Sequence, residues 1–282
     1  MKNLGGKTAV ITGAATGIGR ALALRCAGAG MNVVLADIDK AALEATRGEL
    51  GQSGAKAIAV PTDVSSPERV EELARKAVEA FGAVHLLCNN AGVAFGTSVW
   101  ETSLDDWHWV LGVNLWGVVH GVRIFMPILL EQGGEAHIVN TASIQGLITH
   151  HALSAPYQVS KHAVVSLSEQ LRFELARRGA AVGVSVLCPG WARTRIGDSG
   201  RLRPPTERPG EVAAFAPDQE EAYEHCMKAV ENGADPDEVA ARTLDAVREN
   251  RFYVLPHPEW KARIRDRMEG ILDERAPDTT LY

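Results

Sequence analysis

Short apolar runs alternate with longer amphipathic stretches along most of the chain. Six runs rich in Val, Ile, Leu and Ala predict strands at residues 8–11, 32–36, 57–60, 86–88, 137–140 and 183–187. Helical patterns lie between these runs, at about residues 17–29, 40–51, 67–81, 105–131 and 157–178. Because the strands are apolar at consecutive positions, both faces of each strand are expected to be buried. The alternation predicts an α/β fold with a doubly wound parallel sheet and helices on both faces.

The rhythm of the chain breaks between about residues 194 and 232, where glycines and prolines are mixed with charged residues. Long, weakly structured insertions in compact domains are more often lids or binding loops than linkers. A helical pattern at 236–249 and a strand-like run at 252–255 then return to the sheet pattern. We therefore expect one domain over residues 1–282, with a substrate-binding lid at 194–232 and a C-terminal extension at 256–282.

Composition excludes several classes of protein. The chain has 282 residues, 46% of them hydrophobic, and its net charge of -6 gives no basic surface for nucleic acid or anionic lipid. The apolar run at 117–130 is interrupted by His120, Arg123 and Pro127, and we expect it to be too short and too polar to cross a bilayer. The first seven residues lead straight into a strand pattern, which does not fit a signal peptide.

The four cysteines are Cys26, Cys88, Cys188 and Cys226, and they form no Cys-x-x-Cys pair. Buried free thiols in a reducing compartment fit this spacing better than a disulfide framework or a zinc site. The sequence thus predicts a cytoplasmic protein without a metal site.

The first predicted strand ends in a glycine-rich turn that opens a helix. The turn carries Thr12, Gly13, Thr16, Gly17, Ile18 and Gly19. Glycines let a backbone turn tightly and approach a diphosphate, whose charge is favoured at a helix N-terminus. Such turns are often no more than tight loops, but this one lies between a strand and a helix and is followed by an acid after the second strand. It predicts a dinucleotide site.

That acid is Asp37, at the end of the second predicted strand. A carboxylate there accepts hydrogen bonds from the adenosine ribose hydroxyls and repels a 2′-phosphate. The alternative interpretation is a helix N-cap, for which Asp39 is better placed. Position 16 could carry a basic side chain that binds the 2′-phosphate, but it is Thr16, which also favours NAD. We therefore favour NAD over NADP, with NADP kept as the alternative.

Polar and small residues follow the third and fourth predicted strands. Asp63, before Val64, could reach the adenine amino group or could simply shape a turn. Asn90, Ala91 and Gly92 combine an amide with small residues, as a backbone passing close to a flat ligand requires.

Tyr157 and Lys161 are four residues apart in a predicted helix, and Ser143 lies a short loop upstream. A phenol has a pKa of about 10 and is a poor base near neutrality. Residues four apart share one helix face, so the amine could lie beside the phenol oxygen and lower its pKa. Alone, a Tyr-x-x-x-Lys on a solvated helix is more often accidental.

These motifs occur in order: the Thr-Gly-x-x-x-Gly-x-Gly turn, Asn-Asn-Ala-Gly, a serine, Tyr-x-x-x-Lys and Pro-Gly. As a set they resemble the short-chain dehydrogenase/reductase family in its compact single-domain form. The resemblance spans roughly residues 7–194, with weaker agreement to 255. It implies a Rossmann-type sheet and an oxidoreductase that transfers a hydride between NAD(H) and a secondary alcohol or ketone.

The resemblance also implies roles for individual residues. Tyr157 would be the acid/base, Lys161 would lower its pKa and hold the nicotinamide ribose, and Ser143 would bind the substrate oxygen. Asn114 would hold a water that links Lys161 to solvent. The nicotinamide would be bordered by Pro189, Gly190 and Thr194.

The substrate pocket is expected to be walled by residues 93–95, Ile144, Gln145, Leu153, Trp191 and the 194–232 segment. Trp191 could narrow the pocket or stack on an aromatic substrate, and core packing is an equally good interpretation. An apolar wall suggests a medium-sized hydrophobic or aromatic alcohol or ketone. The adjacent His150 and His151 are better explained as an exposed loop pair than as metal ligands.

The two longest helical stretches, at 105–131 and 157–178, are apolar over much of their circumference. Such helices need cover on more than one side. Family members commonly bury these faces between subunits, so a homodimer or homotetramer is expected. The alternative is that the two helices are covered by packing within one subunit. The alternative functions are an NADPH-dependent carbonyl reductase, a non-catalytic nucleotide-sensing regulator, and a sugar epimerase or dehydratase on a related fold.

Overall fold

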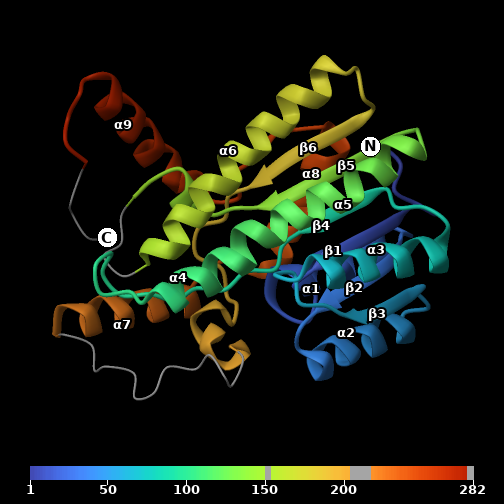
Figure 1. The fold of residues 1–282 in the computed structure, drawn as a ribbon, viewed down its shortest axis with the longest axis horizontal. Coiled ribbons are helices and arrows are strands. Elements are labelled where there is room, and N and C mark those ends of the chain that lie inside the picture. The colour runs from blue at the N-terminus through green and yellow to red at the C-terminus, as the bar shows by residue number, and fades with distance from the viewer. Residues whose placement is uncertain (150–153, 204–216, 278–282) are drawn as a thin grey trace.

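The central feature of the structure is a parallel sheet. The structure is a computed structural model that describes residues 1–149, 154–203 and 217–277 (Figure 1). Within those residues seven parallel strands pair in the order β3-β2-β1-β4-β5-β6-β7. Their bounds are Thr8–Thr12 (β1), Asn32–Asp37 (β2), Ala57–Pro61 (β3), Leu86–Asn89 (β4), Ala136–Thr141 (β5), Val182–Leu187 (β6) and Tyr253–Val254 (β7).

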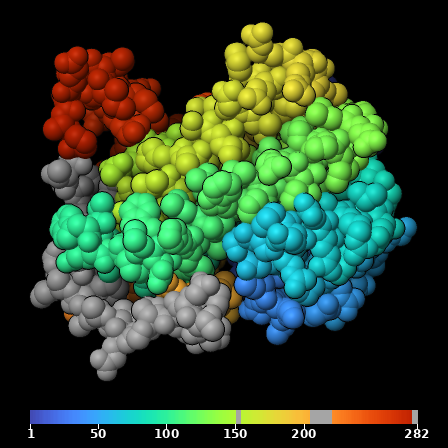
Figure 2. Space-filling model, viewed as in Figure 1, coloured from blue at the N-terminus to red at the C-terminus, as the bar shows by residue number. Residues whose placement is uncertain are grey.

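Helices cover both faces of the sheet. One face buries the apolar sides of α1 (Gly17–Gly28), α2 (Lys40–Gln52) and α8 (Pro236–Glu249). The other face buries those of α3 (Pro67–Phe81), α5 (Gly117–Glu131) and α6 (Ala155–Arg177). Figure 2 shows α4 (Leu104–Leu111) and α5 end to end, with α6 beside them, across this second face of the molecule. The predicted doubly wound Rossmann-type sheet is therefore confirmed.

Local signals in the sequence fix where several helices begin. The Asp39 carboxylate accepts from the Ala42 N–H at 3.1 Å and caps α2, as expected from its position. Ser66 caps α3 ahead of Pro67, whose missing N–H costs nothing in the first turn. Asp235 caps α8 in the same way. These caps explain why the predicted and observed bounds of α3 and α8 agree.

The strand order reverses beside β1, because β2 and β3 lie on one side of it and β4 to β7 on the other. In open parallel sheets, ligands bind outside the carboxyl ends of the strands at such a reversal. The residues at or just beyond these ends include Thr12, Asp37, Asn90, Thr141 and Pro189. The fold therefore brings the predicted motifs to one edge of the sheet.

Residues Leu104–Glu131 form one continuous helical stretch that includes a π-helical turn at Gly112–Trp116. By length and composition alone this stretch could cross a membrane, since its most apolar window has a mean hydropathy of 1.5. The expectation that it is too short is therefore wrong. Its Phe125 and Leu129 are fully buried against the sheet, while 33% of the apolar window as a whole is buried.

The 194–232 segment differs from its prediction as a weakly structured insertion. Its described part contains short 3₁₀ turns at Ile196–Leu202 and a helix, α7 (Pro217–Glu231). A further helix, α9 (Lys261–Leu272), follows β7 and projects from the body of the molecule (Figure 1). Both helices carry apolar residues at helical spacing, with Tyr223, Met227 and Val230 in α7 and Ile264, Met268 and Ile271 in α9. No residue of α9 is buried.

Candidate active site

The glycine-rich turn between β1 and α1 is packed too tightly for side chains. Gly13 has a φ of 66°, and a Cβ on it would lie 2.8 Å from the Ala91 Cα. A Cβ on Gly19 would lie 2.0 Å from the Gly13 carbonyl oxygen. Gly17, with a φ of 55°, faces the Thr194 side chain. Only glycine fits at these positions, and the bare backbone can approach a diphosphate closely.

The loop after β4 is held against that turn by Thr12. The Thr12 hydroxyl accepts from the backbone N–H groups of Asn90 and Ala91, at 2.9 and 3.0 Å. The Asn90 amide donates to the Thr12 carbonyl at 3.0 Å. Gly92 follows, and a Cβ on it would lie 3.5 Å from both the Asn114 Oδ1 and the Lys161 Nζ. The loop therefore connects the glycine turn to the residues around Tyr157.

Two acids lie along the cavity that begins at this turn. The Asp37 carboxylate accepts from the Ala15 and Asp39 N–H groups at 3.0 Å each, and burial raises its pKa. The Asp63 carboxylate accepts from the backbone N–H and the hydroxyl of Ser65, which supports the turn-shaping interpretation. Asp37 and Asp63 both line the cavity, as does Val64.

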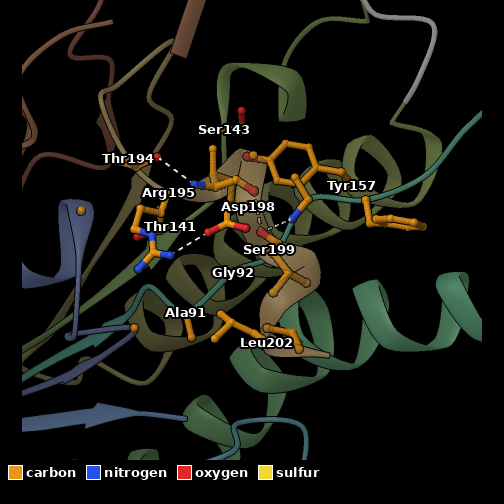
Figure 3. A pocket seen from close by; sticks show the side chains of 18 of the residues that line it. Ala91, Gly92, Thr141, Ser143, Tyr157, Thr194, Arg195, Asp198, Ser199 and Leu202 are labelled. Carbon is orange, nitrogen blue, oxygen red and sulfur yellow. Dashed lines mark hydrogen bonds and ion pairs between the residues drawn. The ribbon is translucent and has the colours of Figure 1, made fainter. Parts of the chain in front are cut away.

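Tyr157 and Ser143 meet at the far end of the cavity, where Figure 3 shows the two side chains next to each other. Ser143 is buried at the end of β5, and its hydroxyl accepts from the Gln145 N–H at 3.2 Å. Burial raises the pKa of Tyr157, and its side-chain hydrogen bond with Ser143 opposes that shift. The pair can therefore hold one oxygen atom of a ligand between two hydroxyl groups.

Lys161 lies one turn along α6 from Tyr157, as predicted. Its Nζ is 5.4 Å from the centroid of the Tyr157 ring and donates to the Thr141 carbonyl at 2.9 Å. Lys161 is 3% exposed, and burial lowers its pKa to about 8. The expected lowering of the Tyr157 pKa is not found, because burial disfavours the phenolate more strongly than the neighbouring groups favour it.

Asn114 lies in the π-helical turn between α4 and α5 and is 0% exposed. Its amide nitrogen donates to the Val93 carbonyl at 2.9 Å and to the Ser160 hydroxyl at 3.1 Å. Its amide oxygen accepts from the Val93 N–H at 2.9 Å. The side chain therefore fixes the loop after Gly92 against α6. π-Helical turns within α-helices frequently occur at functional sites.

Pro189 and Gly190 follow β6 and line the cavity, as do Trp191 and Thr194. The Pro189 carbonyl accepts from the Ile144 N–H at 2.8 Å, directly beside Ser143. From the other side, the Gly190 N–H donates to the His257 Nδ1 at 2.9 Å. Sequence reasoning missed His257, which lies in the C-terminal extension and belongs to none of the motifs.

The substrate end of the cavity is mainly aromatic and apolar. Phe95 and Trp109 meet edge to face with centroids 6.1 Å apart, and both line the cavity. Gln145 is buried there and accepts from the Ser154 hydroxyl at 3.2 Å. Ile196, Leu202, Tyr223 and Met227 come from the 3₁₀ turns and α7. The predicted Leu153, His150 and His151 lie outside the described residues.

A buried ion pair underlies this aromatic wall. Arg203, 4% exposed, pairs with Asp106 of α4, and its guanidinium lies 5.8 Å from the Phe95 ring centroid and 5.3 Å from that of Trp109. Nearby, the Ala94 N–H donates to the Ser199 hydroxyl at 3.1 Å. The 3₁₀ turns are thus joined to α4 and to the loop after Gly92. The sequence offers no signal for this pairing, because its partners are nearly a hundred positions apart.

One cavity of about 950 Å³ joins these groups, from the glycine turn and Asp37 to Ser143, Tyr157 and the aromatic wall. Its volume and length suit a dinucleotide with a small molecule beside it. The glycine turn provides a cradle that any Cβ would fill, and Asp37 provides acceptor atoms where ribose hydroxyls would lie. The residues therefore fit a nicotinamide dinucleotide. Within the described ranges, no cluster of three or more His, Cys, Asp or Glu side chains could hold a metal.

Known proteins share this arrangement. The family model for short chain dehydrogenases matches residues 7–203. A CLA biosynthesis dehydrogenase/reductase of Lactiplantibacillus plantarum is 34% identical, over 99% of this chain and 97% of that protein. A 1-deoxy-11-beta-hydroxypentalenate dehydrogenase of Streptomyces exfoliatus is 38% identical, over 94% of this chain and 88% of the relative.

The similarity extends to solved structures. A short chain dehydrogenase/reductase from Burkholderia phymatum, solved in complex with NAD, superposes with a TM-score of 0.96 at 48% identity and covers 100% of both chains. The fold, the order of the motifs and the match over residues 7–203 agree with one another. This chain therefore belongs to the short-chain dehydrogenase family.

Proposed function

We propose that the protein is an NAD-dependent oxidoreductase that interconverts a secondary alcohol and the corresponding ketone. One observation carries the proposal. Ser143, Tyr157 and Lys161 lie together at one end of a cavity. Its other end contains Asp37 and the glycine turn, which is packed too tightly for any residue with a side chain.

The nicotinamide, bordered by Pro189, Gly190 and Thr194, would supply hydride transfer to and from the alcohol carbon. The chain would move the proton. Tyr157 takes the hydroxyl proton during oxidation, and Ser143 and Tyr157 place two donors around the oxygen as its charge changes. Ser143 is already oriented for this role by the Gln145 N–H.

Lys161 has two tasks in this proposal. Its ammonium donates to the Thr141 carbonyl and lies beside the phenol. The positive charge favours the phenolate form of Tyr157, which accepts the hydroxyl proton of the substrate. The same amine can bond a ribose hydroxyl, because only one of its three donors is used by Thr141. Asn114 would hold the water that links Lys161 to solvent, and it lies close enough to share the space beside Gly92.

The choice of NAD over NADP rests on Asp37. Its carboxylate lines the cavity at the end of β2. There it would accept hydrogen bonds from the ribose hydroxyls and would repel a 2′-phosphate. The structural relative from Burkholderia phymatum is described with NAD bound, which supports the same choice. The other cofactor contacts would come from Gly13, Thr16–Gly19, Asp63, Val64, Asn90–Gly92, Pro189, Gly190 and Thr194, all of which line the cavity.

The substrate is proposed to be a medium-sized hydrophobic or aromatic alcohol or ketone. Phe95, Trp109 and Trp191 wall the cavity beyond Tyr157, with Leu202 and Met227 opposite. Gln145 supplies a polar group in this wall. The names of the relatives include a hydroxypentalenate dehydrogenase and a 3beta-hydroxysteroid dehydrogenase, both of which fit an alcohol on an apolar frame.

We also propose that the protein acts as a cytoplasmic homodimer or homotetramer built from one domain. Trp116, Val159 and Phe173 are exposed on the α4–α5 stretch and on α6, where a second copy could cover them. The free cysteines, three of them buried, support a reducing compartment. The described 3₁₀ turns and α7 line the substrate end of the cavity, which supports a lid within residues 194–232.

The test is a screen of the purified protein against secondary alcohols and ketones with NAD(H) and NADP(H), followed by nicotinamide absorbance. We expect turnover with at least one apolar alcohol and a higher kcat/KM for NAD than for NADP. NADH binding is measured separately by fluorescence. A protein that binds neither cofactor and turns over no substrate would contradict the proposal.

A further inference from the structure

The C-terminal extension returns to the nicotinamide end of the cavity. After β7 the chain runs through residues 255–260 and places His257 directly behind Gly190. The Gly190 N–H donates to the His257 Nδ1 at 2.9 Å. Gly190 lines the cavity and His257 does not, so the imidazole supports the cavity wall without forming its surface.

The hydrogen bond fixes the protonation state of the ring. Because Nδ1 accepts from a backbone N–H, it carries no proton, and the ring must be the neutral Nε2–H tautomer. His257 is 9% exposed, and burial lowers its pKa. Against burial, Glu259, a hydrogen bond with the Trp191 backbone and Glu238 favour the protonated form, while Arg242 opposes it. The neutral acceptor is therefore the form present near pH 7.

The contact between the extension and Gly190 is close. A Cβ on Gly190 would lie 2.6 Å from the Trp260 indole nitrogen and 3.2 Å from the His257 Cγ. Glycine at 190 thus lets both side chains approach the backbone. The contact requires glycine at position 190, because any side chain there would displace the two rings.

The Pro189–Gly190 backbone is held from two sides. The Ile144 N–H, next to Ser143, donates to the Pro189 carbonyl at 2.8 Å, while His257 accepts from Gly190. A third hydrogen bond joins the Ala234 N–H to the Trp191 carbonyl at 3.0 Å. Hydrogen bonds therefore connect the segment of Ser143 to the Pro189–Gly190 backbone and connect that backbone to His257. Of these residues, His257 lies farthest from the cavity.

We propose that His257 is a positioning residue for cofactor binding: its neutral imidazole fixes the Pro189–Gly190 backbone at the nicotinamide end of the cavity. The inference rests on the proposed function for the identity of the cofactor. Loss of the acceptor would leave the Gly190 N–H buried and unpaired and would let the backbone move, so cofactor affinity should fall more than substrate affinity.

The test compares His257→Leu with His257→Asn. The asparagine oxygen can replace Nδ1 as acceptor, whereas leucine fills the space without accepting. We expect His257→Leu to raise the NADH dissociation constant and the KM for NAD by about tenfold, the loss of one buried hydrogen bond. The KM for the alcohol should change much less. His257→Asn should recover most of the lost affinity, and hydrogen exchange at the Gly190 amide should be faster only in the leucine variant.

His85 provides a matched control. Its Nδ1 accepts from the Thr8 N–H at 3.1 Å, a bond of the same kind at the amino end of β1 and outside the cavity. His85→Leu should lower thermal stability but leave NADH affinity unchanged. Equal kinetic effects of the leucine substitutions at 85 and 257 would mean that His257 acts only through stability, and would overturn the proposal.

A measurement on the unaltered protein covers the case in which the His257 variants do not fold. Nitrogen-15 spectra of labelled histidine should show His257 as the Nε2–H tautomer, whereas an Nδ1–H tautomer would overturn the proposal. Failure of the proposed function is distinguishable, since the wild-type protein would then bind no NADH. Normal NADH binding by both wild type and His257→Leu would reject the role of His257 alone.

Discussion

The Lys161 amine lies 5.4 Å from the centroid of the Tyr157 ring, yet burial shifts the pKa of each group in the direction that favours its neutral form. Burial raises the pKa of Tyr157 and lowers that of Lys161 to about 8. Spacing alone predicts the proximity of the two groups. It does not predict that both are buried, so proton transfer at this site depends on desolvation as much as on the neighbouring charge.

The Lys161 shift predicts how stability depends on pH. The folded pKa is about 8 and the ordinary value is 10.5, so between these values the unfolded chain binds more protons than the folded one. Stability from this group therefore rises with pH from about 8 to 10.5 and is constant below about 8. Lys161→Met removes the titration. We expect wild type to gain about 2 kcal/mol of unfolding free energy relative to this variant between pH 8 and pH 10.

Urea unfolding at several pH values measures this difference. Lys228→Met, at an exposed position on α7, is the control for the replacement of a lysine by methionine as such. A constant difference between wild type and Lys161→Met would show that the buried amine does not titrate there.

Tyr157→Phe should reduce kcat by about 10²–10⁴-fold, the range for loss of a general acid/base. The ring remains, and so do the Lys161 contact with Thr141 and the cofactor cavity, so NADH affinity should stay within about threefold of wild type. Single-turnover absorbance and NADH fluorescence separate the two effects. Tyr253→Phe removes an exposed hydroxyl that bonds Glu169 and should be kinetically silent. Substantial activity in Tyr157→Phe would remove the assigned role.

The parts of the fold that were predictable are those governed by local signals. β1 and β2 each have a run of consecutive apolar residues at their centre, and Ser66-Pro67 and Asp235-Pro236 mark the starts of α3 and α8. The Gly13–Gly19 turn is predictable for a similar reason, because close backbone packing requires glycine whatever the rest of the chain does.

The parts that were missed depend on contacts between distant segments. His257 reaches Gly190 only because β7 pairs with β6, and Arg203 reaches Asp106 only because the 3₁₀ turns fold onto α4. No periodicity or spacing in the sequence encodes either approach. α9 carries Ile264, Met268 and Ile271 at helical spacing, yet none of its residues is buried, so it lies outside the alternation of strands and covering helices from which the fold was predicted.

Asp37→Ala should shift cofactor preference toward NADP. The substitution removes the charge that repels a 2′-phosphate and the acceptors for ribose hydroxyls, so the ratio of kcat/KM for NADP to that for NAD should rise by about tenfold or more. It also removes the acceptor of the Ala15 N–H, which should destabilise the fold by about 1 kcal/mol.

Asp235→Ala separates these two consequences. Asp235 also accepts from a backbone N–H, at the start of α8, but does not line the cavity. It should lower stability by a similar amount without changing the cofactor ratio. An unchanged ratio in Asp37→Ala would place the ribose elsewhere in the cavity.

The Arg203–Asp106 pair predicts which changes alter the substrate end of the cavity alone. Arg203→Leu leaves the Asp106 carboxylate buried without its cation, which should cost about 3–5 kcal/mol of stability. Phe95 and Trp109 lose the guanidinium that lies against both rings, so the KM for the alcohol should rise about tenfold while NADH affinity is kept. Arg203→Lys keeps the charge but not the planar stacking and should give intermediate values.

Arg25→Leu is the control for this last prediction, because Arg25 also pairs with a carboxylate, that of Asp237, but on the exposed surface and away from the cavity. Exposed pairs contribute about 0–1 kcal/mol, so neither the KM for the alcohol nor stability should change much. Steady-state kinetics with alcohol and NAD varied separately provide the comparison. If Arg203→Leu raises both KM values equally, the pair supports the whole cavity and the aromatic wall is not its specific target.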